Sequence, residues 1–128
     1  MESPRFLTEQ QVVALHAQLV QRYGGDPGVR DIGLLRSAIA QPAAMYDGAW
    51  LHADLFEMAA AYHFHLVSNH PCVDGNQRIG AACAIVFLAV NGVELEPDEA
   101  GLVEITLRVA RGEAEKSDVA AFLRARAR

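Results

Sequence analysis

The stretch that decides the fold class is HPCVDGNQRIGAACAIVFLAVNG, residues 70–92. Its part NQRIGAACAIVFLAV, residues 76–90, is almost entirely apolar, and the pair Asn91-Gly92 that follows is a common helix stop. A helix that is apolar on every side needs covering partners all round, so it belongs at the centre of a domain. We therefore expect residues 76–90 to be the central helix of a helical bundle.

Two helices are expected near the start of the chain. A capping box of Thr8 and Gln11 predicts a first helix over residues 9–23, where apolar residues recur at helical spacing. The following YGGDPGVRD is dense in glycine and proline and is expected to be a loop. Asp31 at its end is placed to cap a second helix, which Pro42 closes.

The third helix is expected to begin near Asp54 and to end before Pro71, which disfavours a helical residue ahead of it. Between the second and third helices, residues 43–51 are expected to form a short surface flap. Its Asp47-Gly48 pair fits a tight turn between two short extended pieces.

Two closing helices complete the expected bundle, one over LVEITLRVARG from Leu102 and one over DVAAFLRARAR from a Ser117 cap. The segment VELEPDEAG ahead of them is expected to be a connector. The sequence thus predicts an all-α fold, a compact bundle of about six helices that forms a single domain over residues 1–128.

Charge and composition narrow the function classes. Eleven Lys and Arg against sixteen Asp and Glu give a formal charge of -5, so no basic field indicates nucleic-acid binding. The start of the chain, MESPRFLTEQQ, has neither a basic leader nor an apolar signal core, and we expect no membrane insertion and a cytoplasmic protein. In that compartment Cys72 and Cys83 are expected to be reduced, buried thiols.

The loop ahead of the central helix is the candidate site. Gly75 can take a positive φ, and Asn76 is expected to cap the helix. The amides of Gln77, Arg78 and Ile79 would then point outward without partners, which makes a cradle for an anion. The guanidinium of Arg78 adds a planar donor fork that suits phosphate oxygens.

Two further side chains of this loop suggest a reaction. Asp74 lies just ahead of the cradle, where its carboxylate would oppose a phosphate unless Mg²⁺ lay between them. His70, which Pro71 is expected to force into extended geometry, titrates near neutrality and could take a proton from an attacking hydroxyl. These residue types together indicate phosphoryl or nucleotidyl transfer.

HPCVDGNQR resembles the signature of the Fic/Doc superfamily, which reads roughly histidine, proline, phenylalanine, any residue, aspartate or glutamate, glycine, asparagine, any residue, arginine. The resemblance extends from about Phe6 to Asp98 and is closer to Doc-type toxins than to the larger Fic enzymes. It implies a small helical bundle that binds ATP with Mg²⁺. By position it implies His70 as general base, Asp74 as the Mg²⁺ ligand, Arg78 as phosphate clamp, and Gly75, Asn76, Gln77 and Arg78 as the nucleotide-binding residues.

The resemblance also implies a substrate and a partner. Doc toxins phosphorylate translation elongation factor Tu, so the implied activity is a protein Ser/Thr phosphotransferase that arrests translation. The flap at residues 46–51 would align the target peptide by edge pairing. Doc-type toxins are silenced by a separate antitoxin, so a Phd-like antitoxin is the implied partner.

The chain departs from the family pattern in three places: at Cys72, at Gln77 and at the Ile79-Gly80 pair, which stands where Doc sequences typically have threonine and alanine. Cys72 replaces the phenylalanine that anchors the loop, and Gln77 stands where Fic enzymes have glycine and Doc toxins usually have lysine. A Fic-like nucleotidyl transferase that AMPylates a protein hydroxyl, and a catalytically decayed interaction module, therefore stay as alternatives. Gly80 is a costly residue inside a helix, by roughly 1 kcal/mol against alanine, and no role for it follows from the sequence.

A zinc site was the competing interpretation of the local His and Cys content. His63 and His65 project from nearly opposite faces of one helix, so they do not converge with His70 and Cys72 on one ion, and we expect no zinc. Arg30 is expected to make only a local ion pair beside the Asp31 cap.

Overall fold

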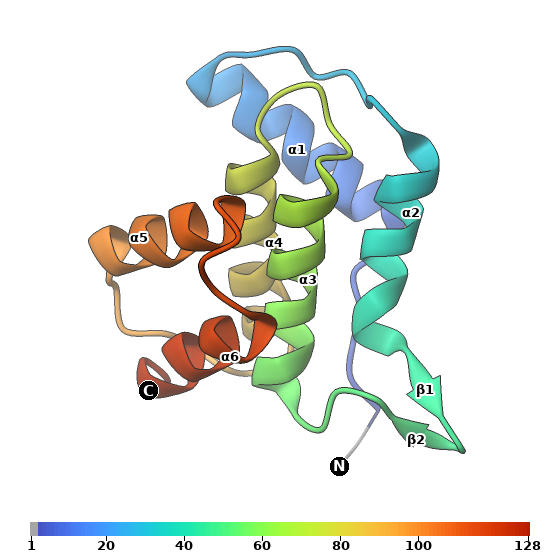
Figure 1. The fold of residues 1–128 in the computed structure, drawn as a ribbon, viewed down its shortest axis with the longest axis vertical. Coiled ribbons are helices and arrows are strands. Elements are labelled where there is room, and N and C mark those ends of the chain that lie inside the picture. The colour runs from blue at the N-terminus through green and yellow to red at the C-terminus, as the bar shows by residue number, and fades with distance from the viewer. Residues whose placement is uncertain (1–2) are drawn as a thin grey trace.

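The computed structural model describes residues 3–128 and confirms the all-α prediction. Six α-helices and one two-stranded hairpin make up the fold (Figure 1). In chain order the elements are α1 (Glu9–Tyr23), α2 (Ile32–Ala40), a 3₁₀ turn η1 (Gln41–Ala43), β1 (Met45–Tyr46), β2 (Ala49–Trp50), α3 (Leu55–Asn69), α4 (Asn76–Val90), α5 (Glu99–Ala110) and α6 (Lys116–Ala125).

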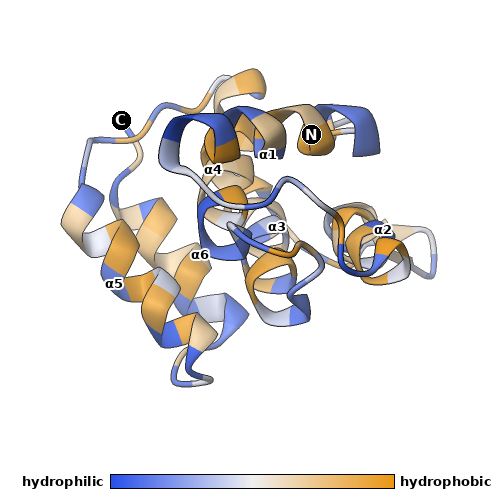
Figure 2. Cartoon of the chain, turned by 90° about the horizontal axis from the view of Figure 1, so that it is seen from above, coloured by the Kyte–Doolittle hydropathy of each residue, from blue (hydrophilic) through white to orange (hydrophobic). Residues whose placement is uncertain are grey.

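The helices α3 and α4 stand side by side at the centre, with α2 on one side, α5 and α6 on the other, and α1 running across behind them (Figure 1). Apolar residues colour much of both central helices in Figure 2. The most enclosed helix is α3, in which Ala59 to His63 are fully buried, whereas α4 leaves Ile85 41% exposed. The prediction of α4 as a central helix is confirmed, but its apolar surface is not covered on every side.

Gly80 allows the two central helices to approach each other closely. A Cβ atom placed on Gly80 would lie 2.7 Å from Val67 Cγ2 and 3.0 Å from the carbonyl oxygen of His63, both on α3. Real carbon atoms approach to about 3.5–4.0 Å. The glycine that the sequence left unexplained is therefore required by helix packing.

The predicted starts of the first three helices are confirmed, and the structure shows a side-chain cap at each. Thr8 and Gln11 form the capping box of α1, and the carboxylates of Asp31 and Asp54 accept hydrogen bonds from the first turns of α2 and α3. A short side chain that accepts from the backbone is sufficient to set each start.

The predicted starts of the closing helices were wrong. Helix α5 begins at Glu99 under an Asp98 cap, inside the expected connector, and α6 begins at Lys116 through a capping box of Glu115 and Asp118 rather than at Ser117.

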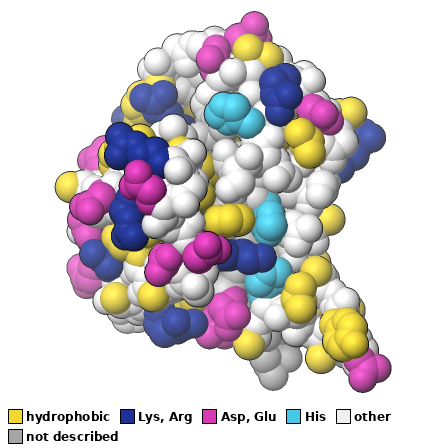
Figure 3. Space-filling view, viewed as in Figure 1, with side chains coloured by type: hydrophobic (Ala, Val, Ile, Leu, Met, Phe, Trp, Pro, Cys, Tyr) yellow, Lys and Arg dark blue, Asp and Glu magenta, His cyan; other side chains and the backbone are white. Residues whose placement is uncertain are grey.

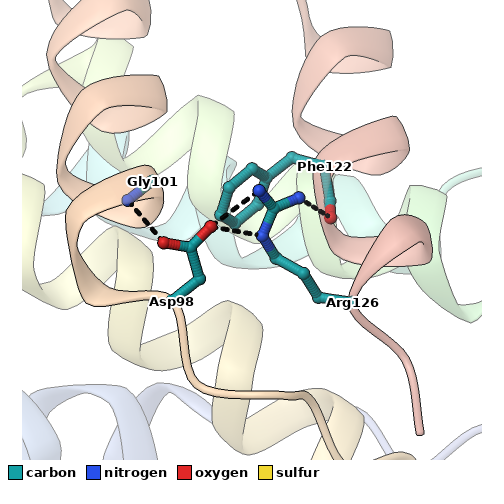
Figure 4. Close-up of polar contacts among 4 residues, drawn as sticks. All are labelled: Asp98, Gly101, Phe122 and Arg126. Carbon is teal, nitrogen blue, oxygen red and sulfur yellow. Dashed lines mark hydrogen bonds and ion pairs between the residues drawn. The ribbon is translucent and has the colours of Figure 1, made fainter.

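Asp98 also ties the two closing helices together. Its carboxylate accepts from the Gly101 amide and from the Arg126 guanidinium, which stacks 3.7 Å from the Phe122 ring centroid (Figure 4).

The flap forms as predicted, but at an unexpected place. Strands β1 and β2 pair in antiparallel register around a turn in which Asp47 and Gly48 both have positive φ. Helix α3 separates this hairpin from the 70–75 loop, and its fifteen residues span about 22 Å. Figure 1 shows the hairpin and that loop at opposite ends of α3. The hairpin therefore does not lie beside the loop, and its expected role in aligning a target peptide there gains no support from this arrangement.

Within residues 3–128, no helix combines the length and the apolar content needed to cross a bilayer. The two thiols, Cys72 and Cys83, are free and buried, as predicted. Burial raises the pKa of both, that of Cys83 to about 12.

Candidate functional site

His70 is the residue at which α3 stops, but its conformation differs from the prediction. Its backbone is left-handed, with φ 54° and ψ 48°, rather than extended. The reason is a pair of contacts to the loop ahead of α2: Arg30 Nε donates to the carbonyl of His70 at 2.7 Å, and its Nη2 donates to that of Asn69 at 3.2 Å. The left-handed turn ends the helix, and the His70 side chain is exposed.

Asn76 was wrongly predicted as the cap of α4. Gly75 is the cap residue, with φ 78°, and no side chain caps the helix. The buried Asn76 side chain instead brackets Cys72: its Oδ1 accepts from the Cys72 N–H and its Nδ2 donates to the Cys72 carbonyl, both at 2.9 Å. The Asn76 side chain therefore stabilises the loop at Cys72 and does not cap α4.

The start of α4 nevertheless offers free amides. The N–H groups of Asn76, Gln77 and Arg78 belong to the first turn and have no intrahelical acceptor. The Ile79 amide, which was expected to be free, bonds to the Gly75 carbonyl at 2.9 Å. The predicted anion cradle thus lies one residue earlier in the chain.

Two of the three oxygen atoms of Asp74, the backbone carbonyl oxygen and one carboxylate oxygen, accept hydrogen bonds. Its Oδ2 accepts from the Asp26 amide at 2.8 Å, and its carbonyl lies 2.7 Å from Nε2 of His16 on α1. The structure shows no hydrogen bond to Oδ1 from residues 3–128. One carboxylate oxygen is therefore left for a cation.

Arg78 has an aromatic partner instead of an acidic one. Its guanidinium lies 4.5 Å from the ring centroid of Tyr23, at the end of α1. No salt bridge to Arg78 forms among the described residues. A cation stacked on a ring keeps its hydrogen-bond donors available, so Arg78 can still bind an anion.

A loop distant in sequence supports the whole arrangement. The amides of Arg30 and Asp31 donate to the Pro71 carbonyl at 2.8 and 3.0 Å, and the Val73 amide donates to Gly28 at 3.0 Å. We name residues 24–31 the supporting loop. Local sequence patterns do not reveal the roles of His16, Tyr23, Asp26 and Arg30, because each lies some 40 to 58 positions away from the residue it contacts.

The predicted site residues share one open cavity of about 660 Å³ between α1, α4 and α5. Its apolar wall belongs to α1, α4 and α5, and its polar end belongs to the 70–78 loop. Figure 3 shows a histidine and charged side chains of both signs at the corresponding end of the molecule. The residues of the prediction that line the cavity are His70, Asp74, Gly75, Asn76, Gln77 and Arg78.

No zinc cluster is present in the described part of the chain, since no three His, Cys, Asp or Glu side chains converge there. His63 is fully buried and its Nε2 lies 2.8 Å from the Thr106 hydroxyl.

His65 and His52 face Lys116, whose Nζ lies 3.1 and 3.2 Å from their Nε2 atoms. Figure 3 shows histidines beside a cation on this face. Burial, and to a lesser extent the positive charge of Lys116, lowers the pKa of His65 to about 4.

Comparison with known proteins assigns the chain to a family. The sequence model of the Fic/DOC family matches residues 6–88, which include the whole 70–78 segment, all of α3 and all but the last two residues of α4. The chain belongs to the Fic/DOC family.

Two relatives make this Fic/DOC protein Doc-like. Toxin Doc of Mycolicibacterium smegmatis is 45% identical over 76 residues, which are 59% of this chain and 58% of that protein. Protein kinase doc of Escherichia phage P1 is 34% identical over 120 residues, 94% of each chain. The first alignment thus spans less than two thirds of that toxin's length, whereas the second spans nearly all of the phage protein.

Two of the departures from the family pattern, Cys72 and Gln77, have different structural settings. Cys72 is 2% exposed, and its backbone is held by Asn76 and by a bridge to Val29, so the loop does not depend on a large anchoring side chain. Gln77 is exposed at the cavity, where its side chain adds polarity without charge.

Proposed function

We propose that this protein is a Doc-like toxin that transfers the terminal phosphoryl group of ATP to a serine or threonine hydroxyl of translation elongation factor Tu in the cytoplasm. One observation carries the proposal: a single cavity gathers a helix start with free amides, a carboxylate and an exposed imidazole. The likeness to a relative named Protein kinase doc over nearly its full length supports phosphoryl transfer in particular.

The start of α4 would bind the phosphates. Backbone N–H groups at a helix N-terminus, helped by the helix dipole, bind phosphate oxygens without any reorganisation. The Arg78 guanidinium would add a charge-assisted contact as negative charge spreads over the transferred group.

Asp74 suits a Mg²⁺ ion that shares phosphate oxygens. One carboxylate oxygen is fixed by Asp26 and the other has no bond from residues 3–128, and Mg²⁺ commonly takes only one or two protein carboxylates. When bound, the ion would neutralise charge between the carboxylate and the phosphates.

His70 would act as the general base. Its imidazole would take the proton of the attacking hydroxyl while the oxygen bonds to the terminal phosphorus and the bond to the bridging oxygen breaks, leaving ADP. The supporting loop fixes the backbone of His70, so the exposed ring is presented from a rigid base.

The reaction type is tested with ATP labelled at either the α or the γ phosphate, incubated with Mg²⁺ and purified elongation factor Tu. Label transferred from the γ position alone is expected, and His70→Ala is expected to abolish the transfer. Label transferred from the α position would instead support nucleotidyl transfer by the same residues. No transfer from either position would support the decayed module.

Toxicity is tested by expression in a bacterial host. Growth arrest by the wild type, but not by His70→Ala, is expected. We also propose a Phd-like antitoxin as partner, supported by the apolar wall of the cavity, where Ile85 and Val103 are 41% and 52% exposed. Co-expression of such an antitoxin is expected to restore growth.

A further inference from the structure

His16 is a buried histidine on α1 whose side chain makes a contact outside its own helix. Its side chain is 3% exposed on α1, and its Nε2 lies 2.7 Å from the backbone carbonyl oxygen of Asp74. A carbonyl oxygen can only accept, so Nε2 carries the proton and donates it. His16 therefore holds one specific carbonyl of the 70–78 loop toward α1.

Fixing this carbonyl also fixes the next amide. The peptide bond between Asp74 and Gly75 is trans, as are all those in the described chain, and in a trans peptide the C=O and N–H bonds point in opposite directions. Because the Asp74 carbonyl points at α1, the Gly75 N–H points away from α1. No acceptor among residues 3–128 bonds to that N–H, and Gly75 lines the cavity.

Gly75 makes such control necessary. Glycine reaches positive and negative φ with similar ease, so the peptide ahead of it can rotate at little cost unless a contact selects one orientation. Gly75 has φ 78°, and a Cβ atom placed on it would lie 3.4 Å from His16 Nε2. The same histidine thus bonds to the peptide on one side of Gly75 and also occupies the space next to the position that a side chain at residue 75 would take.

We propose that His16 is a positioning residue: its Nε2–H bond to the Asp74 carbonyl sets the Asp74–Gly75 peptide so that the Gly75 N–H faces the cavity and joins the amides of α4 in binding a phosphate oxygen. The inferred orientation of the peptide depends only on the contacts described above. The role in phosphate binding also rests on the proposed function.

The orientation is tested without any ligand, by residual dipolar couplings of backbone amides in partly aligned protein. Wild type and His16→Gln, whose amide nitrogen can donate to the same carbonyl, are expected to share one Gly75 N–H coupling. His16→Leu lacks a donor, and its Gly75 coupling is expected to fall by half or more while those within α4 stay unchanged. An unchanged Gly75 coupling in His16→Leu overturns the proposal.

The control is Val12→Ala, which removes core packing from the same helix without touching the loop. It is expected to lower the denaturation midpoint but to preserve the Gly75 coupling. Should His16→Leu fail to fold, the ¹⁵N spectrum of the wild-type imidazole decides instead. A protonated Nε2 in the neutral ring supports the proposal, and a bare Nε2 overturns it.

Calorimetry with Mg²⁺ and ADP then tests the phosphate contact. His16→Leu is expected to bind ADP about tenfold more weakly, the value of one lost hydrogen bond to a charged group, and His16→Gln within about threefold of wild type. Equal affinities of His16→Leu and wild type overturn the phosphate role. If wild type itself binds no ADP, the proposed function fails, while the dipolar couplings still decide the role of His16.

Discussion

Replacing Gly80 by alanine sets two effects of similar size against each other. Alanine in place of glycine inside a helix stabilises it by roughly 1 kcal/mol. The added methyl group, however, would lie 2.7 Å from Val67 Cγ2 and 3.0 Å from the His63 carbonyl oxygen. Val67 is β-branched within a helix and has one strongly preferred rotamer, and the carbonyl belongs to the backbone, so neither neighbour can move cheaply.

The packing effect is expected to be the larger one. Overfilling a packed interior costs typically about 1–3 kcal/mol, and a 2.7 Å approach to a stiff neighbour belongs in the upper part of that range, at about 2–3 kcal/mol. After the helical gain of roughly 1 kcal/mol is subtracted, Gly80→Ala should lower the free energy of unfolding by about 1–2 kcal/mol. Urea denaturation followed by helical circular dichroism measures this change. A Gly80→Ala protein as stable as wild type, or more stable, would refute the reasoning.

A double-mutant cycle separates the clash from a general effect of alanine. Val67→Ala deletes the methyl group that lies nearest to position 80, so adding Gly80→Ala to it is expected to cost at least about 1 kcal/mol less than adding it to wild type. Gly33→Ala on α2 is the matched control, since the nearest atom to its added Cβ is the side-chain oxygen Oδ1 of Asp31 at 3.3 Å. Its effect is expected to be smaller than that of Gly80→Ala.

Three further outcomes are expected. Burial lowers the pKa of His63 and of His65 to about 4, so the unfolded chain binds more protons below about pH 6.5 and stability falls as the pH drops toward 4. For His63 alone the loss in unfolding free energy is about 2–3 kcal/mol near pH 4.5, measured by urea denaturation at that pH and at neutrality, and an unchanged value would contradict it. A thiol reagent such as dithiobisnitrobenzoate should label neither Cys72 nor Cys83 in the native protein and both in denaturant, because burial raises their pKa and blocks access. The side chain in Asn76→Asp cannot donate to the Cys72 carbonyl, so this variant should lower the free energy of unfolding by about 1–3 kcal/mol in the same urea assay. An unchanged value would show that the hydrogen bonds between Asn76 and Cys72 do not stabilise the protein.

The sequence predicted best those features that depend on neighbouring residues. The Thr8 and Gln11 box, the Asp31 cap, the helix start near Asp54 and the Asp47-Gly48 turn each depend on residues a few positions apart, and all are present in the structure. The starts of α5 and α6 were open to the same reasoning, since an acidic cap lies at Asp98 and a capping box lies at Glu115.

The candidate site was predictable in content but not in geometry. The cavity gathers every residue expected from the 70–78 loop, because the loop is short and begins a helix. The left-handed turn at His70, however, depends on Arg30, which lies forty positions away. Asn76 had two local options, to cap a helix or to bracket a turn, and only the folded surroundings of Cys72 decide between them.

The supporting loop holds the site mainly through main-chain atoms of residues 26, 28, 30 and 31. Natural selection that preserves these main-chain contacts preserves the path of the backbone and does not require particular side chains to make them. Descendants of this protein can therefore change much of the outer surface of that loop, and with it recognition by other molecules, while the reacting groups keep their relative placement.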